Sequence, residues 1–398
     1  MFTAEFVKMM GENLGEQRAS AILEALGGEP VISVRINPFK ISLEGLREHF
    51  GPIAGDAVPW AADEAFYLTE RPSFTLDPLF HAGAYYVQEA SSMFVGQFFD
   101  AAAEELGEEN LNVLDLCAAP GGKTTQILSH LNGSGHLVAN EVIGSRVPIL
   151  AENVAKWGCG NVTVANSDAS CFGKAAGGRG GLSHDIIVTD VPCSGEGMFR
   201  KGEQAQDNWS VNNVMLCAAR QKRIVSDVWP ALREGGFLIY STCTFNRYED
   251  EDNVEWICNE LGAECMKQRH FYPGEDRGEG FFAALLRKNG DFRPQRDRKQ
   301  TRPAYRIYES QFPQADEALS VSLDRSRYPV VELSKEDALK FLAKEPLVFE
   351  DRPVGLILLT YKDIALGFVK NLGRRSNNLH PSPRRIKDLR ACKSTANR

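Results

Sequence analysis

The chain has 398 residues, more than one compact core needs, so we expect two to three domains. Apolar residues make up 43% and charged residues 25%, as in ordinary globular proteins. No apolar run reaches the length of a membrane span, and Glu5, Lys8 and Glu12 interrupt the N-terminal segment. We therefore expect neither a membrane helix nor a signal peptide, and no contact with a membrane.

The cysteines and histidines indicate a reducing compartment. Nine cysteines, an odd number, are scattered without a CxxC pair, and the seven histidines do not cluster with them. This distribution predicts neither a disulfide framework nor a zinc site. We expect a cytoplasmic protein with free thiols and no bound metal.

The net charge of −8 at first argues against a polyanionic partner. Basic residues are concentrated, however, in two segments. Residues 287–306 hold 8 Lys/Arg against 2 Asp, and residues 371–398 hold 8 Lys/Arg against 1 Asp. Such segments either bind nucleic acid on an otherwise acidic body or form a solvated linker and tail.

Residues 1–74 are predicted to form a small α+β domain. Residues 2–26 have helical periodicity that ends at Gly27-Gly28, and residues 31–37 alternate like a strand that stops at Pro38. A short helix is expected over residues 43–50 and a strand over 65–68. A further helix is expected over 86–99, beyond this domain.

Residues 75–288 are predicted to form a Rossmann-like α/β domain. From residue 111 onwards, apolar strands alternate with helices, which indicates a parallel sheet covered on both faces. The expected strands are 111–117, 135–141, 162–166, 185–190 and 237–241, with a late strand over 281–287. The expected helices are 124–131, 145–157, 213–232 and 248–261. Ligands of such sheets bind beyond the carboxyl ends of the strands.

The last part of the chain is predicted to be a small β-rich domain over residues 306–398. Two short strands are expected there, over 354–361 and 364–369. The Arg-rich, proline-containing residues 289–305 indicate a basic linker before it.

A turn of small residues follows the first strand of the α/β domain and opens a helix. It consists of Cys117, Ala118, Ala119, Pro120, Gly121, Gly122 and Lys123. Such a turn lets backbone N–H groups approach a ligand closely. A phosphate-binding loop needs glycine where Cys117 stands, and the dinucleotide pattern GxGxxG is absent, so the turn predicts a different ligand.

Three carboxylates at strand ends indicate which ligand this is. Glu141, 24 residues beyond Cys117, is placed to accept hydrogen bonds from ribose hydroxyls. Asp168 follows the third strand, in reach of an adenine amine, and Asp190 ends the fourth. Any one such acid is more often a cap or turn former. The ordered set predicts an adenosine-containing ligand without pyrophosphate, namely S-adenosylmethionine.

Two cysteines follow strands that are neighbours in a sheet of this type. Cys193 comes three residues after Asp190, and Cys243 follows the fifth strand, so both thiols are expected to face one cleft. A thiolate that adds to carbon 6 of cytosine makes carbon 5 nucleophilic toward a sulfonium methyl group. Asp190 is placed to stabilise the adduct, Lys123 to activate a thiol of ordinary pKa ~8.5, and Cys193 to assist loss of the carbon-5 proton. The alternative for either cysteine is a small buried hydrophobe.

Several ordered motifs resemble the Sun/nucleolar-protein family of RNA cytosine-C5 methyltransferases, and most closely its bacterial RsmF-type group. The motifs are residues 117–124, residues 190–197 and Thr242-Cys243-Thr244. Residues 33–38 and 85–93 are similar to N-terminal signatures of that group. Residues 367–371 and 374–381 resemble the end of its PUA-like RNA-binding module.

The resemblance implies a role for each matching residue. Cys243 resembles the nucleophile and Cys193 the cysteine that assists release. The turn from Cys117 to Lys123 resembles the cofactor site, together with Glu141, Arg146, Asp168 and Asp190. DNA cytosine-C5 enzymes use the Pro-Cys cysteine instead, which makes Cys193 the rival nucleophile.

The resemblance also implies RNA-binding roles for the N-terminal and C-terminal domains. The expected substrate is 16S ribosomal RNA or the small ribosomal subunit, bound by a monomer. The alternatives are a non-catalytic ribosomal RNA-binding assembly factor, a cytosine-C5 enzyme that acts on tRNA, and a methyltransferase for DNA or an exocyclic amine.

Overall fold

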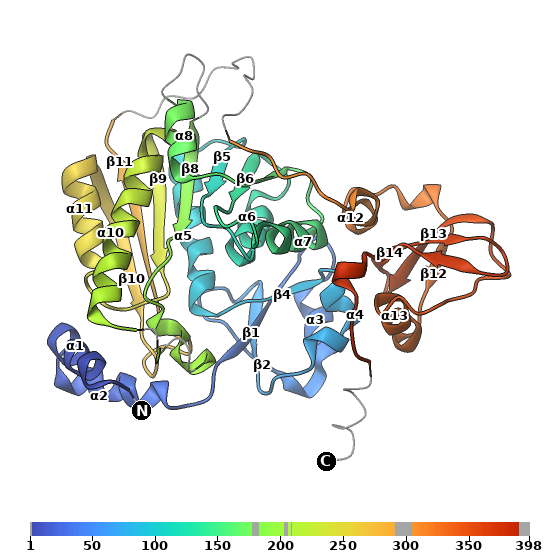
Figure 1. The fold of residues 1–398 in the computed structure, drawn as a ribbon, viewed down its shortest axis with the longest axis horizontal. Helices are drawn as coiled ribbons and strands as arrows, with labels where there is room; N and C mark the ends of the chain where they lie inside the picture. Colours follow the sequence, from blue (N-terminus) through green and yellow to red (C-terminus); the bar gives the residue numbers. More distant parts are fainter. Residues whose placement is uncertain (1, 177–182, 203–205, 208, 291–304, 390–398) are drawn as a thin grey trace.

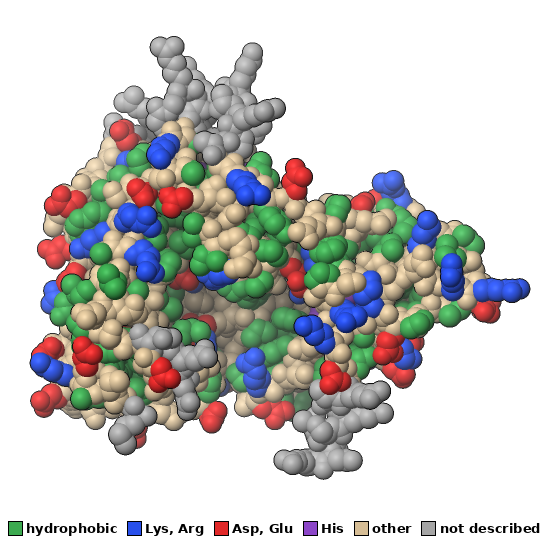
Figure 2. Space-filling model, viewed as in Figure 1, with side chains coloured by type: hydrophobic (Ala, Val, Ile, Leu, Met, Phe, Trp, Pro, Cys, Tyr) green, Lys and Arg blue, Asp and Glu red, His purple; other side chains and the backbone are tan. Residues whose placement is uncertain are grey.

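A computed structural model describes residues 2–176, 183–202, 206–207, 209–290 and 305–389. The chain forms three units, and the C-terminal one projects from the body as a lobe that carries Lys and Arg side chains on the face shown in Figure 2. The expected architecture is confirmed: an N-terminal α+β unit, a central Rossmann-like sheet and a C-terminal β-rich unit. No helix within the described ranges has the length and apolarity of a membrane span.

The N-terminal segment is broken at Gly15 rather than continuous. α1 (Ala4–Leu14) and α2 (Glu16–Leu26) replace the single helix expected over residues 2–26, because Gly15 adopts a φ of 81° that helical residues cannot share. Both helices pack on Phe199 and Trp209 of the central unit. The helical periodicity was correct, but the break at a lone glycine gave no separate signal.

Four antiparallel strands form the N-terminal sheet, in the order β2-β3-β1-β4. They are β1 (Ile32–Ile36), β2 (Ala54–Ala57), β3 (Ala65–Leu68) and β4 (Tyr85–Val87), with α3 (Leu43–Phe50) and α4 (Pro78–His81) beside them. β4 pairs with β1, so this sheet uses residues beyond the boundary expected at residue 74. The helix expected over 86–99 is wrong in its first half, because backbone pairing takes Tyr85–Val87 into the sheet. α5 (Val95–Leu106) begins only after the turn that the Glu89 carboxylate stabilises by accepting from the N–H of Ser91.

The central unit is a seven-stranded sheet in the order β10-β11-β9-β8-β5-β6-β7. Its strands are β5 (Asn112–Asp115), β6 (His136–Asn140), β7 (Val162–Ala165), β8 (His184–Asp190), β9 (Leu232–Thr242), β10 (Ala263–Phe271) and β11 (Phe281–Lys288). The five strands β5 to β9 are parallel to one another as expected, whereas β11, which lies between β9 and β10, runs antiparallel to both of them. No crossover helix joins β10 to β11, and strands without a crossover must run antiparallel.

Helices cover both faces of this sheet (Figure 1). They are α5, α6 (Gly122–Leu131), α7 (Val147–Trp157), α8 (Ala169–Ala176), α10 (Val211–Val228) and α11 (Glu251–Leu261). One apolar core includes side chains of α8, α10 and α11, and a second includes those of α5 and α6. Because the chain crosses from β7 at one side of β5 to β8 at the other, the turn after β5 lies beside the end of β8.

The C-terminal unit is a four-stranded sheet in the order β12-β13-β14-β15. It consists of β12 (Val330–Glu332), β13 (Gly355–Tyr361), β14 (Ile364–Asn371) and β15 (Ser376–Asn378), with α12 (Pro313–Leu319) and α13 (Lys335–Leu342). The two strands expected here are β13 and β14. The predicted basic linker lies almost wholly outside the described residues. Beyond the linker, Tyr308 donates its N–H to Val164 O at the edge of β7.

The C-terminal and N-terminal sheets share one apolar core. Phe341 of α13 and Ile357 of β13 belong to the same buried cluster as Val34 of β1 and Leu79 of α4. Lys362 Nζ also lies 3.0 Å from His49 Nδ1 across this junction. The two terminal units therefore meet through a packed interior rather than through a surface contact alone.

Candidate active site

The turn between β5 and α6 contains Gly121 and Gly122. Hydrogen bonds from α6 and from the N-terminal sheet hold it in place. Gly121 adopts a φ of 117°, in the region that favours glycine. From within, Thr124 Oγ1 donates to Asp115 Oδ2 at 2.6 Å, and burial raises the pKa of Asp115 to about 7. From the N-terminal sheet, Arg35 Nη2 donates to Gly122 O at 3.1 Å.

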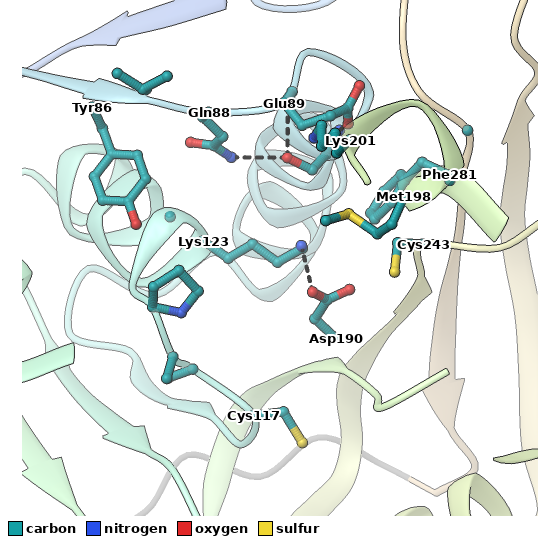
Figure 3. Close-up of a pocket in the computed structure, with 18 residues that line it drawn as sticks. Tyr86, Gln88, Glu89, Cys117, Lys123, Asp190, Met198, Lys201, Cys243 and Phe281 are labelled. Carbon is teal, nitrogen blue, oxygen red and sulfur yellow. Dashed lines mark hydrogen bonds and ion pairs between the residues drawn. The ribbon is translucent and has the colours of Figure 1, made fainter. Parts of the chain in front are cut away.

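A cavity of about 290 Å³ opens above this turn (Figure 3). Its lining contains these predicted residues: Cys117, Ala118, Ala119, Pro120, Gly122, Lys123, Asp190 and Cys243. The sheet order explains the gathering, since the turn after β5 and the ends of β8 and β9 meet at one edge. The structure thus brings the turn, one carboxylate and one thiol to a single hollow.

Lys123 and Asp190, which both line the cavity, form an ion pair. Lys123 Nζ lies 2.9 Å from Asp190 Oδ2, and it also lies 5.0 Å from the centre of the Phe281 ring. Burial disfavours the charged ammonium, but the Asp190 carboxylate outweighs it and raises the pKa of Lys123. Asp190 Oδ1 accepts from Ser241 Oγ at 2.9 Å. Lys123 is thus a fixed cation.

The two thiols are in contact. Cys193 Sγ and Cys243 Sγ are 3.0 Å apart, and Cys243 lines the cavity. The expectation that β8 and β9 are neighbours is confirmed, with Asp190 opposite Ser241 in their parallel register. Hydrogen bonding to Cys243, together with burial, raises the pKa of Cys193 well above the ordinary thiol value. In this arrangement the Cys193 S–H can donate a hydrogen bond to Cys243 Sγ.

Four other predicted residues, Gly121, Glu141, Arg146 and Asp168, are not in the cavity lining. Gly121 shapes the turn, and Arg146 donates to Ala119 O at 2.6 Å while its other nitrogen lies 3.2 Å from Glu141 Oε2. Glu141 is buried at the end of β6 and also accepts from Ile143 N at 2.8 Å. Asp168 is exposed and caps α8 by accepting from Ser170 N at 3.0 Å. Their cofactor contacts stay predictions.

Several lining residues were quoted in motifs without being assigned to the site. Tyr86, Gln88 and Glu89 belong to the 85–93 signature, and Met198 follows the 190–197 motif. Phe281 is the first residue of β11. This strand was expected from the sequence, but its first residue was not expected to line the site. Membership of a motif was the available signal for the first three, and the position next to a motif was the signal for Met198. Only the sheet order places Phe281 here.

The fold and the site together define a Rossmann-like methyltransferase, and three family profiles match the chain. "16S rRNA methyltransferase RsmB/F" matches residues 104–287, "N-terminal domain of 16S rRNA methyltransferase RsmF" residues 2–90, and "Methyltransferase RsmF PUA domain" residues 328–386. The chain belongs to this RsmB/F family of S-adenosylmethionine-dependent methyltransferases, and its three matched segments place it in the RsmF-type group.

Individual relatives agree with this assignment. Ribosomal RNA small subunit methyltransferase F of Pectobacterium atrosepticum is 34% identical over 301 residues, covering 69% of this chain and 59% of the relative. Its counterpart in Citrobacter koseri is 36% identical over 287 residues, covering 66% and 58%. The chain spans about three fifths of the length of these curated relatives.

Solved structures share the fold. NSun6 from Pyrococcus horikoshii with SFG has a TM-score of 0.62 at 22% identity, covering 73% of this chain and 99% of that one. A methyltransferase homologue from Pyrococcus horikoshii has a TM-score of 0.61 at 27% identity, covering 72% and 95%.

Proposed function

We propose that this protein methylates carbon 5 of a cytosine in 16S ribosomal RNA, with S-adenosylmethionine as methyl donor and Cys243 as nucleophile. The observation that carries the proposal is the pair of thiols, 3.0 Å apart, whose member Cys243 opens on the cavity beside Asp190. The family and its ribosomal RNA methyltransferase relatives support the substrate class.

The cavity suits the methyl donor. Its floor is a turn of alanine, proline and glycine, whose small side chains let a ligand approach the backbone. The Lys123–Asp190 ion pair lies next to this turn. The buried carboxylate of Glu141 pairs with Arg146, which donates to the turn. S-adenosylmethionine, when bound there, supplies an electrophilic methyl group. We assign its contacts to the turn from Cys117 to Lys123, with Glu141, Arg146, Asp168 and Asp190.

The chain's own residues divide the remaining work. The Cys243 thiolate forms a bond to carbon 6 of the cytosine, and this makes carbon 5 nucleophilic. The Cys193 S–H stabilises that thiolate by hydrogen bonding before the attack. Asp190 hydrogen-bonds the pyrimidine edge, while Lys123 fixes its carboxylate. Once Cys243 is bonded to carbon 6 it carries no negative charge, so Cys193 can release its proton to solvent and act as the base. The Cys193 thiolate then takes the carbon-5 proton, the C5–H electrons restore the 5,6 double bond, and Cys243 leaves as a thiolate.

The positions of the two thiols argue for this division of roles and against the reverse. Cys243 lines the cavity, where a substrate carbon can reach its sulfur, whereas Cys193 is not in the lining and contacts Cys243. A non-catalytic RNA-binding factor would gain nothing from two thiols in contact beside a carboxylate. Methylation of an exocyclic amine would leave Cys243 without a role.

Single alanine variants of the two cysteines test the proposal. With labelled S-adenosylmethionine and 16S ribosomal RNA fragments, Cys243→Ala is expected to abolish both turnover and any covalent RNA adduct. Cys193→Ala is expected to accumulate a denaturation-resistant protein–RNA complex, because attack proceeds while release fails. Exchanged outcomes would make Cys193 the nucleophile.

Cys217→Ala, which removes a buried thiol on α10, is the matched control for the two cysteine variants. This control should turn over like the wild type. The identity of the methylated base tests the substrate class. A labelled base other than 5-methylcytosine would contradict the proposal. Labelling of tRNA in place of 16S ribosomal RNA would change the substrate but keep the chemistry.

A further inference from the structure

Each of the two loops that carry the thiols also carries a buried glutamate, and each glutamate contacts the other loop. Glu196 lies three residues after Cys193, and Glu249 lies six residues after Cys243. Both side chains are fully enclosed, with exposures of 0%. Neither lines the cavity, so neither is placed to touch a substrate.

Glu196, from the Cys193 loop, reaches the residues that directly follow Cys243. Its Oε2 accepts from the backbone N–H of Phe245 at 3.0 Å and from the hydroxyl of Thr244. Its Oε1 accepts from Trp209 Nε1 at 3.1 Å, which fixes the carboxylate from the other side. The Cys193 loop therefore holds the backbone just beyond Cys243.

Glu249, from the Cys243 loop, reaches back to the residue that follows Cys193. Its Oε2 accepts from the backbone N–H of Ser194 at 3.0 Å and from Gln221 Nε2 at 2.7 Å. The contacts are thus reciprocal: each cysteine has, on its C-terminal side, a backbone N–H held by a carboxylate from the opposite loop. Parallel β8 and β9 alone fix the strands, but not the loops beyond them.

One amide joins the two carboxylates. Asn246 Nδ2 donates to Glu196 Oε1 and to Glu249 Oε1, at 2.9 Å in each case. All the donors named in this network are neutral. Burial raises the pKa of Glu196 to about 7, and burial also raises the pKa of Glu249 above its ordinary value. Buried carboxylates are costly to keep, whereas a fully satisfied polar network specifies one geometry that an apolar filling would not.

We propose that Glu196 and Glu249 are positioning residues that hold the Cys193 and Cys243 thiols in contact. In this reading the 3.0 Å separation of the sulfurs is set by the crossed carboxylates rather than by the sheet. The inference deepens the proposed function and rests on it for the catalytic importance of the thiol pair, but the geometry itself can be measured without methyl transfer.

Thiol–disulfide exchange measures that geometry. Oxidised glutathione converts the two thiols to a Cys193–Cys243 disulfide and releases two reduced glutathiones, so electrons and protons balance. Because the sulfurs need to approach only to about 2.05 Å, the equilibrium constant reports how well the pair is held together. Peptide mapping by mass spectrometry gives the fraction oxidised, and methylation assays on the same samples give kcat and KM.

The variants are Glu196→Gln and Glu249→Gln, which keep the shape but replace one acceptor oxygen by a donor. Each is expected to lower the exchange constant about tenfold, since a buried acceptor contact is lost. The kcat should fall while the KM for S-adenosylmethionine stays unchanged, because the glycine turn is untouched. Thr244→Val, which removes the hydroxyl that donates to Glu196 and accepts from Asn246 Nδ2 at 2.8 Å but leaves both carboxylates in place, is the milder variant if the others fail to fold.

Asp185→Asn is the matched control. Asp185 is a buried carboxylate at the opposite end of β8, where it accepts from Asn112 N at 2.6 Å and pairs with Arg233. It should lower stability without changing the exchange constant. The proposal is overturned if the glutamine variants exchange like the wild type, or if Asp185→Asn lowers the constant equally. A wild type that methylates no RNA would instead refute the proposed function and leave the exchange result to decide the positioning role.

Discussion

Replacement of Arg35 by methionine tests how the N-terminal sheet supports the glycine turn. Arg35 lies on β1 with an exposure of 0%, stacked 4.7 Å from the Trp157 ring. Burial lowers the pKa of its guanidinium to about 10, so the group stays charged at neutral pH. It donates to Gln88 Oε1 at 2.8 Å, to Gly122 O at 3.1 Å and to Thr125 Oγ1 at 2.7 Å.

The expected loss in the free energy of unfolding depends on whether each acceptor of Arg35 keeps another hydrogen-bond donor. Gly122 O retains the Thr125 hydroxyl at 3.0 Å, whereas Arg35 is the donor that Gln88 Oε1 loses. An unsatisfied buried acceptor costs ~1–3 kcal/mol, and each of the other two bonds contributes about 1 kcal/mol. Relief from burying a cation offsets part of this, which leaves a net loss of about 3 kcal/mol.

Urea unfolding followed by circular dichroism measures this loss, and calorimetric titration measures S-adenosylmethionine affinity. We expect the affinity to fall about tenfold, because the Gly122 carbonyl at the start of α6 loses its hydrogen bond to the N-terminal sheet. Arg18→Met is the control, since the Arg18 side chain is 44% exposed although it lies 2.6 Å from Glu275. Its loss should stay below ~1 kcal/mol. Equal losses in the two variants would refute the reasoning.

Two further substitutions test the energetics of the fold. Burial raises the pKa of Asp115 to about 7, so the stability from this carboxyl is complete below its ordinary pKa of 3.8 and is lost as pH rises through 7. Asp115→Asn should therefore raise the apparent Tm by ~2–4 °C at pH 8, with a gain that shrinks toward pH 5; a gain that grows on acidification would contradict this. In Gly83→Ala, at φ +68°, the new Cβ would overlap the Lys156 carbonyl, and we expect a loss above ~3 kcal/mol. Gly107→Ala, at φ +63° in open space, should cost only about 1 kcal/mol, and similar losses by urea unfolding would refute the steric argument.

The central sheet could be predicted because its strands are apolar and because local sequence features mark where each strand begins and ends. Strand β8, expected from residue 185, begins one residue earlier, and helix α6 begins at Gly122 rather than Thr124. β10 escaped prediction because it is an edge strand whose exposed positions carry polar residues such as Glu264 and Arg269. Amphipathic patterns at a sheet edge lack the apolar signal of a buried strand.

The site was predictable where chemistry is concentrated in motifs, and not where it depends on long-range pairing. Asp190, Cys193 and Cys243 follow strand ends, so the sheet topology alone indicated that they meet. The buried carboxylates of Glu196 and Glu249 lie in or near the same motifs, yet their crossing depends on loop conformation. Arg35 lies in an expected strand and in the 33–38 signature, but its contact with the glycine turn was not predicted, because its partners Gln88 and Thr125 are distant in sequence.

The interior shared by the N-terminal and C-terminal sheets limits how the C-terminal lobe can move. A lobe whose Phe341 and Ile357 are packed with Val34 and Leu79 cannot pivot without exposing that interior to water. The distance between the lobe and the thiol pair is therefore fixed by the fold. For the RNA substrate proposed above, a fixed distance would favour surfaces of matching shape, and removal of the lobe would expose an apolar face on the N-terminal sheet.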